Sequence, residues 1–392
     1  MKKTNGHLQK ILAGLLSGLL VLTAVVCAAV RLRQAELPSD WNLMAAETVF
    51  PTVGANVPES STQESEPVQE SDEPAVQENS TVTADSSQIT SSSSESSQKK
   101  QNSDMKENTF EASEPTEEEL QEYAAKHEGE EEYPVNEFTI TQGNQGFGNV
   151  QIKNTSSTDI DIKKELESRL GFAIEDTDKP QVLIYHTHTS ESFLTYDTGY
   201  FYESFYPRTT DTSQNICSVG EEIAKQLNAA GIKTIHDTTL HDYPSYNGAY
   251  DRSYDTVMSY LEKYPSIKVT LDIHRDGIGT DTQKTKPVFT VNGKKAAQIM
   301  ILSGYNEDGW EGFKDWEYNL RFALQIQKTA AEMYPGMVRP LNFSDFMYNM
   351  NINTGSLLIE MGAESNTLEE VRYAGYLLGN VLAEVLKKSR TE

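Results

Sequence analysis

The sequence predicts an α/β domain with a central, mostly parallel sheet flanked by helices, preceded by a transmembrane helix and a disordered linker. Three observations support this prediction. From about residue 136 onward, short apolar segments alternate with helical patterns, as they do in strand–helix–strand units. Residues 11–30 form an apolar run. Between these two regions lies a long acidic segment that is rich in serine and glutamate.

Residues 1–33 are predicted to form a cytoplasmic flank and a transmembrane anchor. The apolar run from Ile11 to Val30 is long enough to span about 30 Å of hydrocarbon. A cleaved signal peptide is the alternative, although its apolar region usually covers only about 7–15 residues. We expect the N-terminus inside and the rest of the chain on the extracytoplasmic side of a cell membrane, crossed once.

Residues 34–135 are predicted to be a disordered linker. Acids greatly outnumber lysines here, so this segment carries most of the formal net charge of −26. Its serine- and glutamate-rich composition buries too little apolar area to offset the entropy of ordering. A few turns of helix around residues 117–126 are an alternative within this segment.

Composition also limits the classes of function. No basic stripe appears, which argues against a nucleic-acid partner. The chain has two cysteines, Cys27 in the apolar run and Cys217 in the predicted domain. An intramolecular disulfide and a cysteine-based zinc site are therefore not expected.

Residues 136–388 are predicted to form a single catalytic α/β domain. Helical periodicity is found in five segments, and Gly231 is placed as the C-cap of the second of them. The turn pair Asn292–Gly293 predicts a hairpin between residues 288–291 and 299–302. The predicted helices cover residues 159–170, 219–227, 251–264, 316–334 and 371–385; the predicted strands cover 138–141, 150–153, 182–185, 232–235, 267–273, 288–291, 299–302 and 356–359.

Three of the predicted strands are followed by histidine or glutamate, residue types that commonly bind metals. His186, His188 and Glu191 follow the strand 182–185, His274 follows 267–273, and Glu360 follows 356–359. In open α/β sheets, ligands bind just beyond the carboxyl ends of the strands. Imidazole and carboxylate together suit zinc, and a catalytic zinc site keeps three protein ligands. The pattern predicts a zinc-dependent hydrolase.

His186 and His274 are the first choices as metal ligands. Glu191 is the third, because it is close in sequence and can fold back toward His186. His188 competes for this place, since residues two apart on an extended segment face the same way. Glu360 is predicted to be the general base and acid that moves protons during hydrolysis.

Neighbouring residues have supporting roles in this hypothesis. Asp272 and Asp276 flank His274 and are candidates to orient its imidazole, although Asp276 can instead start a turn. Arg252 and Arg275 are candidates to hold a substrate carboxylate, with surface ion pairing as the alternative for Arg252. The aromatic stretch 193–207 either lines a substrate groove or packs internally.

Three motifs resemble a known family. They are His186-Thr-His-Thr-Ser-Glu191, Leu271-Asp-Ile-His-Arg-Asp276 and Leu358-Ile-Glu-Met-Gly-Ala-Glu-Ser-Asn366. As a set they resemble the signatures of the stage II sporulation protein P family, over nearly the whole chain. More remotely, the domain is similar to zinc-dependent N-acetylmuramoyl-L-alanine amidases, whose catalytic glutamate lies in a segment like 360–366. Those amidases take a glutamate ligand from the first helix, where this chain has Asn215 and Ile216, so Glu191 or His188 would substitute.

The resemblance implies a peptidoglycan hydrolase that acts during sporulation engulfment. It implies cleavage of the amide between muramic acid and L-alanine, with a second activity on peptide cross-links. It also implies a mother-cell membrane location facing the intermembrane space, and stage II sporulation proteins D and M as partners. The alternatives are a zinc endopeptidase acting on the cross-links, or a non-catalytic, tethered module that binds the cell wall.

Overall fold

The computed structural model describes residue 110 and residues 113–306 and 312–390. All of these belong to one compact unit, Ala75–Glu392. The predicted anchor, residues 1–33, and the linker up to residue 109 lie outside the described residues. Among the described helices, none combines the length and the apolar character that crossing a bilayer requires.

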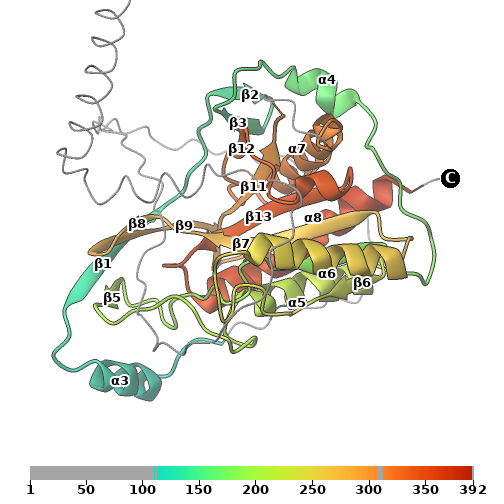
Figure 1. Cartoon of the computed structure of the whole chain (residues 1–392). Helices are drawn as coiled ribbons and strands as arrows, with labels where there is room; N and C mark the ends of the chain where they lie inside the picture. Colours follow the sequence, from blue (N-terminus) through green and yellow to red (C-terminus); the bar gives the residue numbers. More distant parts are fainter. Residues whose placement is uncertain (1–109, 111–112, 307–311, 391–392) are drawn as a thin grey trace, which may run out of the picture. The chain divides into compact units, whose positions relative to one another are not determined.

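An eight-stranded sheet forms the centre of the fold (Figure 1). Five of its seven strand pairings are parallel, and only β2–β3 and β11–β13 are antiparallel within this described sheet. The prediction of a mixed α/β fold with a mostly parallel sheet is confirmed. In spatial order the strands are β2 (Gln145–Phe147), β3 (Val150–Asn154), β12 (Leu341–Ser344), β11 (Ile299–Gly304), β13 (Ser356–Ala363), β7 (Val269–Asp276), β4 (Val182–Tyr185) and β6 (Thr234–His236).

Helices cover both faces of this sheet. In β4, Leu183 and Tyr185 pack with Val257 of α6, whereas Val182 and Ile184 belong to the larger core, to which three other long helices contribute most residues. Because successive strand side chains point to opposite faces, α6 covers one face and the other three cover the opposite one. The helices are α6 (Ala249–Lys263) on the first face, and α5 (Ile216–Ala229), α7 (Trp316–Met333) and α8 (Leu368–Lys388) on the second.

The helix predictions are confirmed with small shifts at the ends. The segment predicted as 159–170 is the shorter α4 (Ile162–Glu167), and a 3-10 turn, η1 (Met350–Ile352), precedes β13. Gly231 follows α5 with φ of 79°, the left-handed conformation expected of a helix-ending glycine. Helix α6 begins at Ala249, two residues before the predicted start at residue 251, and its N-cap is Gly248, which has a left-handed backbone.

A second, smaller sheet contains the predicted hairpin in altered form. Asn292 and Gly293 both have positive φ, 52° and 75°, as a tight two-residue turn requires. The turn joins β9 (Gln283–Val291) to β10 (Lys294–Ala297), whereas residues 299–302 belong to β11 of the central sheet. Ile299 and Ile301 are fully buried there, and the sequence pattern alone does not distinguish these two destinations. The sheet also contains β1 (Glu132–Phe138), β5 (Tyr200–Tyr202) and β8 (Gly279–Thr280).

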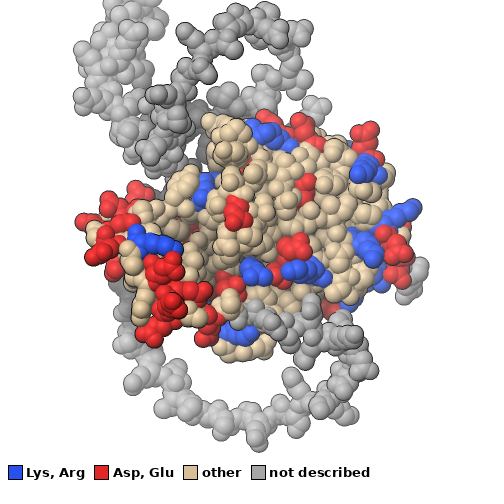
Figure 2. All heavy atoms as spheres, turned by 90° about the horizontal axis from the view of Figure 1, so that it is seen from below, with Lys and Arg blue, Asp and Glu red and all other residues tan. Residues whose placement is uncertain are grey.

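The folded region begins before residue 136. Helix α3 (Glu117–Lys126) starts with a capping box between Thr116 and Glu119. Strand β1 pairs with β5 through residues 132–134 and with β9 through residues 135–138, so the predicted boundary falls inside β1. Figure 2 shows acidic side chains gathered at the end of the visible face where Figure 1 places α3. The acidity that predicted a linker therefore continues into folded structure.

Candidate metal centre and active site

The strand register brings three distant segments to one edge of the central sheet. In the parallel pair β7–β13, Glu360 lies opposite His274. In the pair β4–β7, Tyr185, the last residue of β4, lies opposite Asp272. Matched residues of neighbouring strands point to the same face. Gly362, with φ of 70°, allows the register shift that follows Glu360 in β13.

The turn after β4 is drawn onto β7 by hydrogen bonds. The backbone N–H and the hydroxyl of Thr187 donate to the two oxygens of Asp272, at 2.8 and 2.6 Å. The backbone N–H of Arg275 donates to Oε2 of Glu191 at 3.1 Å. These bonds fix both ends of the segment 186–191 over the strand that carries His274.

His188, Glu191 and His274 form the candidate metal centre. One ligand atom from each lies within 4.8 Å of the others. Nδ1 of His188 is 3.5 Å from Oε1 of Glu191, and Nδ1 of His274 is 3.7 Å from Oε2 of the same carboxylate. Two imidazoles and one carboxylate are the donor set of several catalytic zinc sites. Glu191 and His274 therefore come together as predicted, and the third place is taken by His188.

His186 lies behind this cluster and does not join it. Its Nδ1 is 2.8 Å from the carbonyl oxygen of Ile273, and its Nε2 is 2.9 Å from Nε2 of His236. A carbonyl oxygen only accepts, so Nδ1 of His186 carries the proton and Nε2 accepts from His236. Burial and the neighbouring His236 lower the pKa of His186 to about 3, so the ring is neutral. Through this hydrogen bond, His186 links the end of β4 to Ile273 of β7, the residue before His274.

A carboxylate pairs with the imidazole of His274. Oδ1 of Asp272 lies 2.9 Å from Nε2 of His274, on the side away from Glu191. A carboxylate in this position fixes the orientation of a metal-binding imidazole. The other candidate, Asp276, instead receives hydrogen bonds from Arg339 at 2.8 Å and from the backbone of Gly277. Of the two predicted alternatives, the geometry supports Asp272.

The cluster carries an excess of negative charge. Burial alone would lower the pKa of His274, but Asp272, Glu191 and Glu360 outweigh it and raise this pKa to about 10. Burial alone would raise the pKa of Glu191, but His188, His274 and Arg275 hold it below the usual range. The surroundings therefore favour a positive charge beside Glu191 and His274. A proton on His274 or a bound cation would supply that charge.

Glu360 is a partly exposed acid on the strand next to His274. Its Oε2 is buried and makes no hydrogen bond to any described residue. Burial raises the pKa of Glu360 above the usual range, and the carboxylates of Asp276 and Glu191 add to this, while His274 opposes it. A carboxyl group with a raised pKa beside a metal centre can both accept and return a proton near neutral pH.

Neither predicted substrate-binding arginine has a free guanidinium. Arg252 donates to the carbonyl oxygens of His241, Ser245 and Asn247, and so holds the loop 241–247. The buried Arg275 donates to the carbonyl oxygens of Ser192, Pro207 and Asp276. Backbone acceptors are invisible in a sequence pattern, and in this structure they hold both guanidinium groups.

Aromatic rings beside the centre come from an unexpected part of the chain. In the predicted groove segment 193–207, Tyr196 and Tyr202 pack against Tyr123 of α3. The rings near the candidate ligands are instead Tyr246 and Tyr250. Tyr246 stacks on His188 with ring centroids 4.4 Å apart. No helical or strand pattern marks either tyrosine, although a count of aromatic residues in the segment 243–250 would have drawn attention to it.

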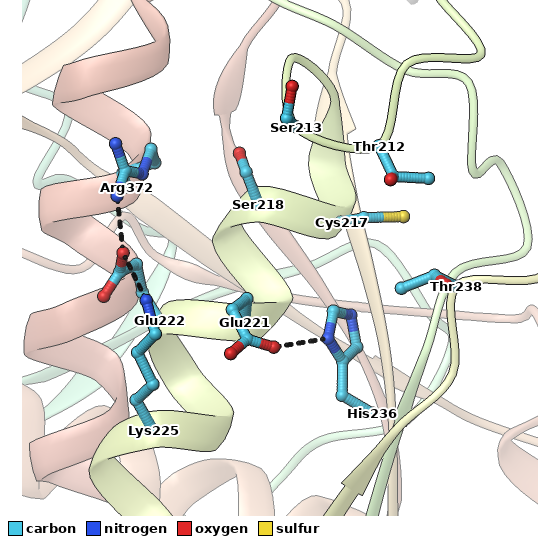
Figure 3. Close-up of a pocket in the computed structure, with 10 residues that line it drawn as sticks. All are labelled: Thr212, Ser213, Cys217, Ser218, Glu221, Glu222, Lys225, His236, Thr238 and Arg372. Atoms are coloured by element: carbon cyan, nitrogen blue, oxygen red, sulfur yellow. Dashed lines mark hydrogen bonds and ion pairs between the residues drawn. The ribbon is translucent and has the colours of Figure 1, made fainter.

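A separate pocket is lined by residues of α5 and by His236 of β6 (Figure 3). It has a volume of about 390 Å³, and its lining includes Cys217, Glu221 and His236 but none of the three candidate ligands. Glu221 lies 3.3 Å from Nδ1 of His236, whose other nitrogen meets His186. Burial, with Asp237 and Asp242, raises the pKa of the Cys217 thiol to about 12, which makes it unreactive.

The mixed α/β fold and the cluster of His188, Glu191 and His274 place this protein in a class, that of candidate metallohydrolases. A family model, Stage II sporulation protein P, matches residues 51–383. The chain belongs to the Stage II sporulation protein P family. A curated relative, Stage II sporulation protein P of Bacillus subtilis (strain 168), is 29% identical over 220 residues, which cover 53% of this chain and 51% of the relative. The chain thus matches about half the length of that relative.

Several solved structures are similar to part of this chain. The N-acetylmuramoyl-L-alanine amidase AmiC2 of Nostoc punctiforme is 13% identical with a TM-score of 0.31, covering 53% of this chain and 96% of that chain. Ami1 of Mycobacterium smegmatis is 14% identical with a TM-score of 0.31, covering 54% and 98%. The CwlD amidase of Clostridioides difficile, solved in complex with the GerS lipoprotein, is 14% identical with a TM-score of 0.30, covering 53% and 99%.

Proposed function

We propose that this protein is a zinc-dependent peptidoglycan hydrolase that cleaves the amide between N-acetylmuramic acid and L-alanine during sporulation. One observation carries the proposal: His188, Glu191 and His274 converge within 4.8 Å, and Glu360 lies in register beside His274. Family membership supports the link to sporulation. The match of the third motif, residues 360–366, to the amidase pattern supports the choice of bond.

The donor set fits zinc. Two imidazoles, one carboxylate and the orienting Asp272 make a three-ligand site of the catalytic type. The raised pKa of His274 marks a place where a cation is favoured. When bound there, zinc would polarise the scissile carbonyl and make a water molecule more acidic.

Glu360 would move the proton in this reaction. As the water oxygen bonds to the carbonyl carbon, its proton passes to the Glu360 carboxylate. As the bond between carbon and nitrogen breaks, Glu360 returns that proton to the leaving amine of L-alanine. The second proton of the water stays on the new carboxyl group and is then lost to the amine, so the products are the lactyl carboxylate of muramic acid and a stem peptide with a protonated amino terminus.

The Glu360→Gln substitution tests this function. It keeps the size of the side chain but removes the proton carrier, so we expect hydrolysis of purified sacculi to fall by about 100-fold or more, with wall binding retained.

Mass spectrometry of the products distinguishes an amidase from an endopeptidase. Free stem peptides support an amidase, whereas uncrosslinked muropeptides in their place would show a zinc endopeptidase. Unchanged hydrolysis by Glu360→Gln would remove Glu360 from the mechanism, and no hydrolysis by the parent protein would favour a binding module.

The anchor, location and partners are also proposals. Residues 1–33 would hold the domain on the extracytoplasmic face of the mother-cell membrane during engulfment, and stage II sporulation proteins D and M would act with it. The apolar run 11–30 supports the anchor, and the family resemblance supports the rest. Co-purification from sporulating cells with tagged protein D or M would test the partners; failure to recover either would oppose this assignment.

A further inference from the structure

Tyr250 lies at the candidate metal centre and is not used by the mechanism above. It is the second residue of α6. Its ring centroid is 5.5 Å from that of His188, edge-on, and 6.4 Å from that of His274, nearly parallel to it. A side chain that contacts both candidate imidazole ligands lines the space in which a substrate carbonyl must sit.

The hydroxyl of Tyr250 has no hydrogen-bonding partner among the described residues, although the side chain is only partly exposed. Tyr260, on the same helix, shows the usual arrangement, since its hydroxyl donates to Asp237 at 3.0 Å. Burial raises the pKa of the Tyr250 hydroxyl, and the carboxylates of Asp272 and Glu360 add to this. A tyrosine hydroxyl without a protein partner can donate a hydrogen bond to a bound substrate.

The surrounding loop holds Tyr250 in place. Asn349 donates through Nδ2 to the backbone carbonyl of Tyr250 and to the hydroxyl of Ser253, both at 3.1 Å. Tyr348 stacks on Tyr250 with centroids 5.4 Å apart. Tyr348 and Asn349 both have positive φ, 39° and 59°. Such strained backbone persists only where its surroundings enforce it, and it is concentrated at functional sites.

We propose that Tyr250 is a catalytic residue, whose phenolic hydroxyl donates a hydrogen bond to the oxygen of the scissile carbonyl as that oxygen gains negative charge. This inference rests on the proposed function. The hydroxyl keeps its proton throughout, because the water proton passes through Glu360. A phenol with an ordinary pKa of about 10 is a neutral donor at physiological pH. A donor placed where charge develops stabilises the transition state more than the bound substrate.

The Tyr250→Phe substitution tests this role, because it removes the hydroxyl and keeps the ring that contacts both histidines. Removing one donor to a developing oxyanion lowers kcat by about 100-fold. We expect that loss on soluble glycan chains that carry stem peptides, with KM, zinc content and melting temperature unchanged. Tyr260→Phe is the matched control, since it removes a hydroxyl from the same helix, and it should keep the parent kcat.

Two results would overturn the inference while leaving the proposed function standing. One is a kcat for Tyr250→Phe within twofold of the parent. The other is a rise in KM or a loss of zinc without a fall in kcat, which would make Tyr250 a binding or structural residue. Binding of the same glycan chains provides a readout that does not depend on turnover. The double variant Tyr250→Phe, Glu360→Gln should bind them as Glu360→Gln does. If the parent protein released no product, both proposals would fall together.

Discussion

At the scale of single residues, two histidines two positions apart have different partners. His188 faces Glu191 and His274, whereas His186 faces Ile273 and His236. The sequence pattern of two imidazoles after a strand cannot distinguish them, because both follow β4 and only the turn decides which one meets the carboxylate. His186 is better described as a positioning residue, since its hydrogen bond ties β4 to the residue that precedes His274.

Metal affinity tests this distinction. We expect His188→Ala to abolish stoichiometric zinc binding, because it removes a ligand. His186→Gln should keep one zinc per chain but weaken its affinity by about 10–100-fold, the usual effect of altering a residue behind a metal ligand. Competition with a chelator of known zinc affinity measures both. His127→Gln, a change near α3, serves as the control. The opposite order, with zinc lost in His186→Gln and retained in His188→Ala, would contradict the assignment.

The charge on His274 makes a prediction about pH for the metal-free protein. The folded protein raises the pKa of this imidazole to about 10, from about 6.5 when unfolded. A raised pKa means that the folded state binds the proton more tightly, so this contribution to stability is complete below about pH 6.5. It is lost as pH rises toward 10. Melting temperatures in chelator from pH 6 to 10 should therefore fall more steeply for the parent than for His274→Gln, and equal slopes would argue against a charged His274.

The residue scale also shows what a sequence can and cannot predict about the site. Glu191, His274 and Glu360 were predicted from their places after apolar strands. The strand register sets Glu360 opposite His274, and the turn after β4 carries Glu191 to His274. Arg252 and Arg275 were assigned to substrate because a sequence does not show which carbonyl groups a guanidinium will meet. Tyr250 was missed because a tyrosine at a helix start has no distinguishing pattern.

At the scale of elements, a buried lysine joins four segments. Nζ of Lys286 in β9 lies 2.6 Å from Asp197, 2.9 Å from Glu370 at the start of α8, and 3.1 Å from Glu137 of β1. Three carboxylates gathered this closely also resemble a metal site, but Lys286 and Lys295 supply positive charge within the group. The cluster therefore links the small sheet to α8.

Substituting this lysine should destabilise the domain. Lys286→Met leaves a buried carboxylate, Glu370, without its cation, and breaking such a pair costs about 3 kcal/mol or more. Lys295 meets Glu137 and Asp197 from a half-buried position, so Lys295→Met should cost less than about 1 kcal/mol. Urea unfolding measures both free energies. Equal losses in the two variants would show that burial of Lys286 contributes nothing.

Helices and turns with a strong sequence pattern were predicted well, whereas the sheet that a given strand joins was predicted less well. The helices α5, α7 and α8 follow from their apolar faces, and the turn at Asn292–Gly293 follows from its residue types. The strand 299–302 joined a different sheet from the one predicted, because the turn fixes only its immediate neighbours. Strand β1 was missed since its first residues resemble the acidic linker, and pairing with β5 and β9 is a contact between distant segments.

At the scale of the whole molecule, the proposed arrangement is an anchored hydrolase. Deleting residues 2–33 should release the protein from the membrane fraction, because it removes the apolar run 11–30. Fractionation of cells expressing the full chain and the deletion, with extraction in high salt, measures this. Zinc binding by the deletion variant is the control for folding. Equal membrane association of the two proteins would contradict the anchor.

The most direct test of the account is a crystal structure of the Glu360→Gln variant with zinc, with anomalous data collected at the zinc absorption edge. The account predicts one zinc peak bounded by His188, Glu191 and His274, with ligand distances of about 2.0–2.2 Å, and Tyr250 facing the open position. A zinc ion held by His186 and His236, or no peak among His188, Glu191 and His274, would contradict it.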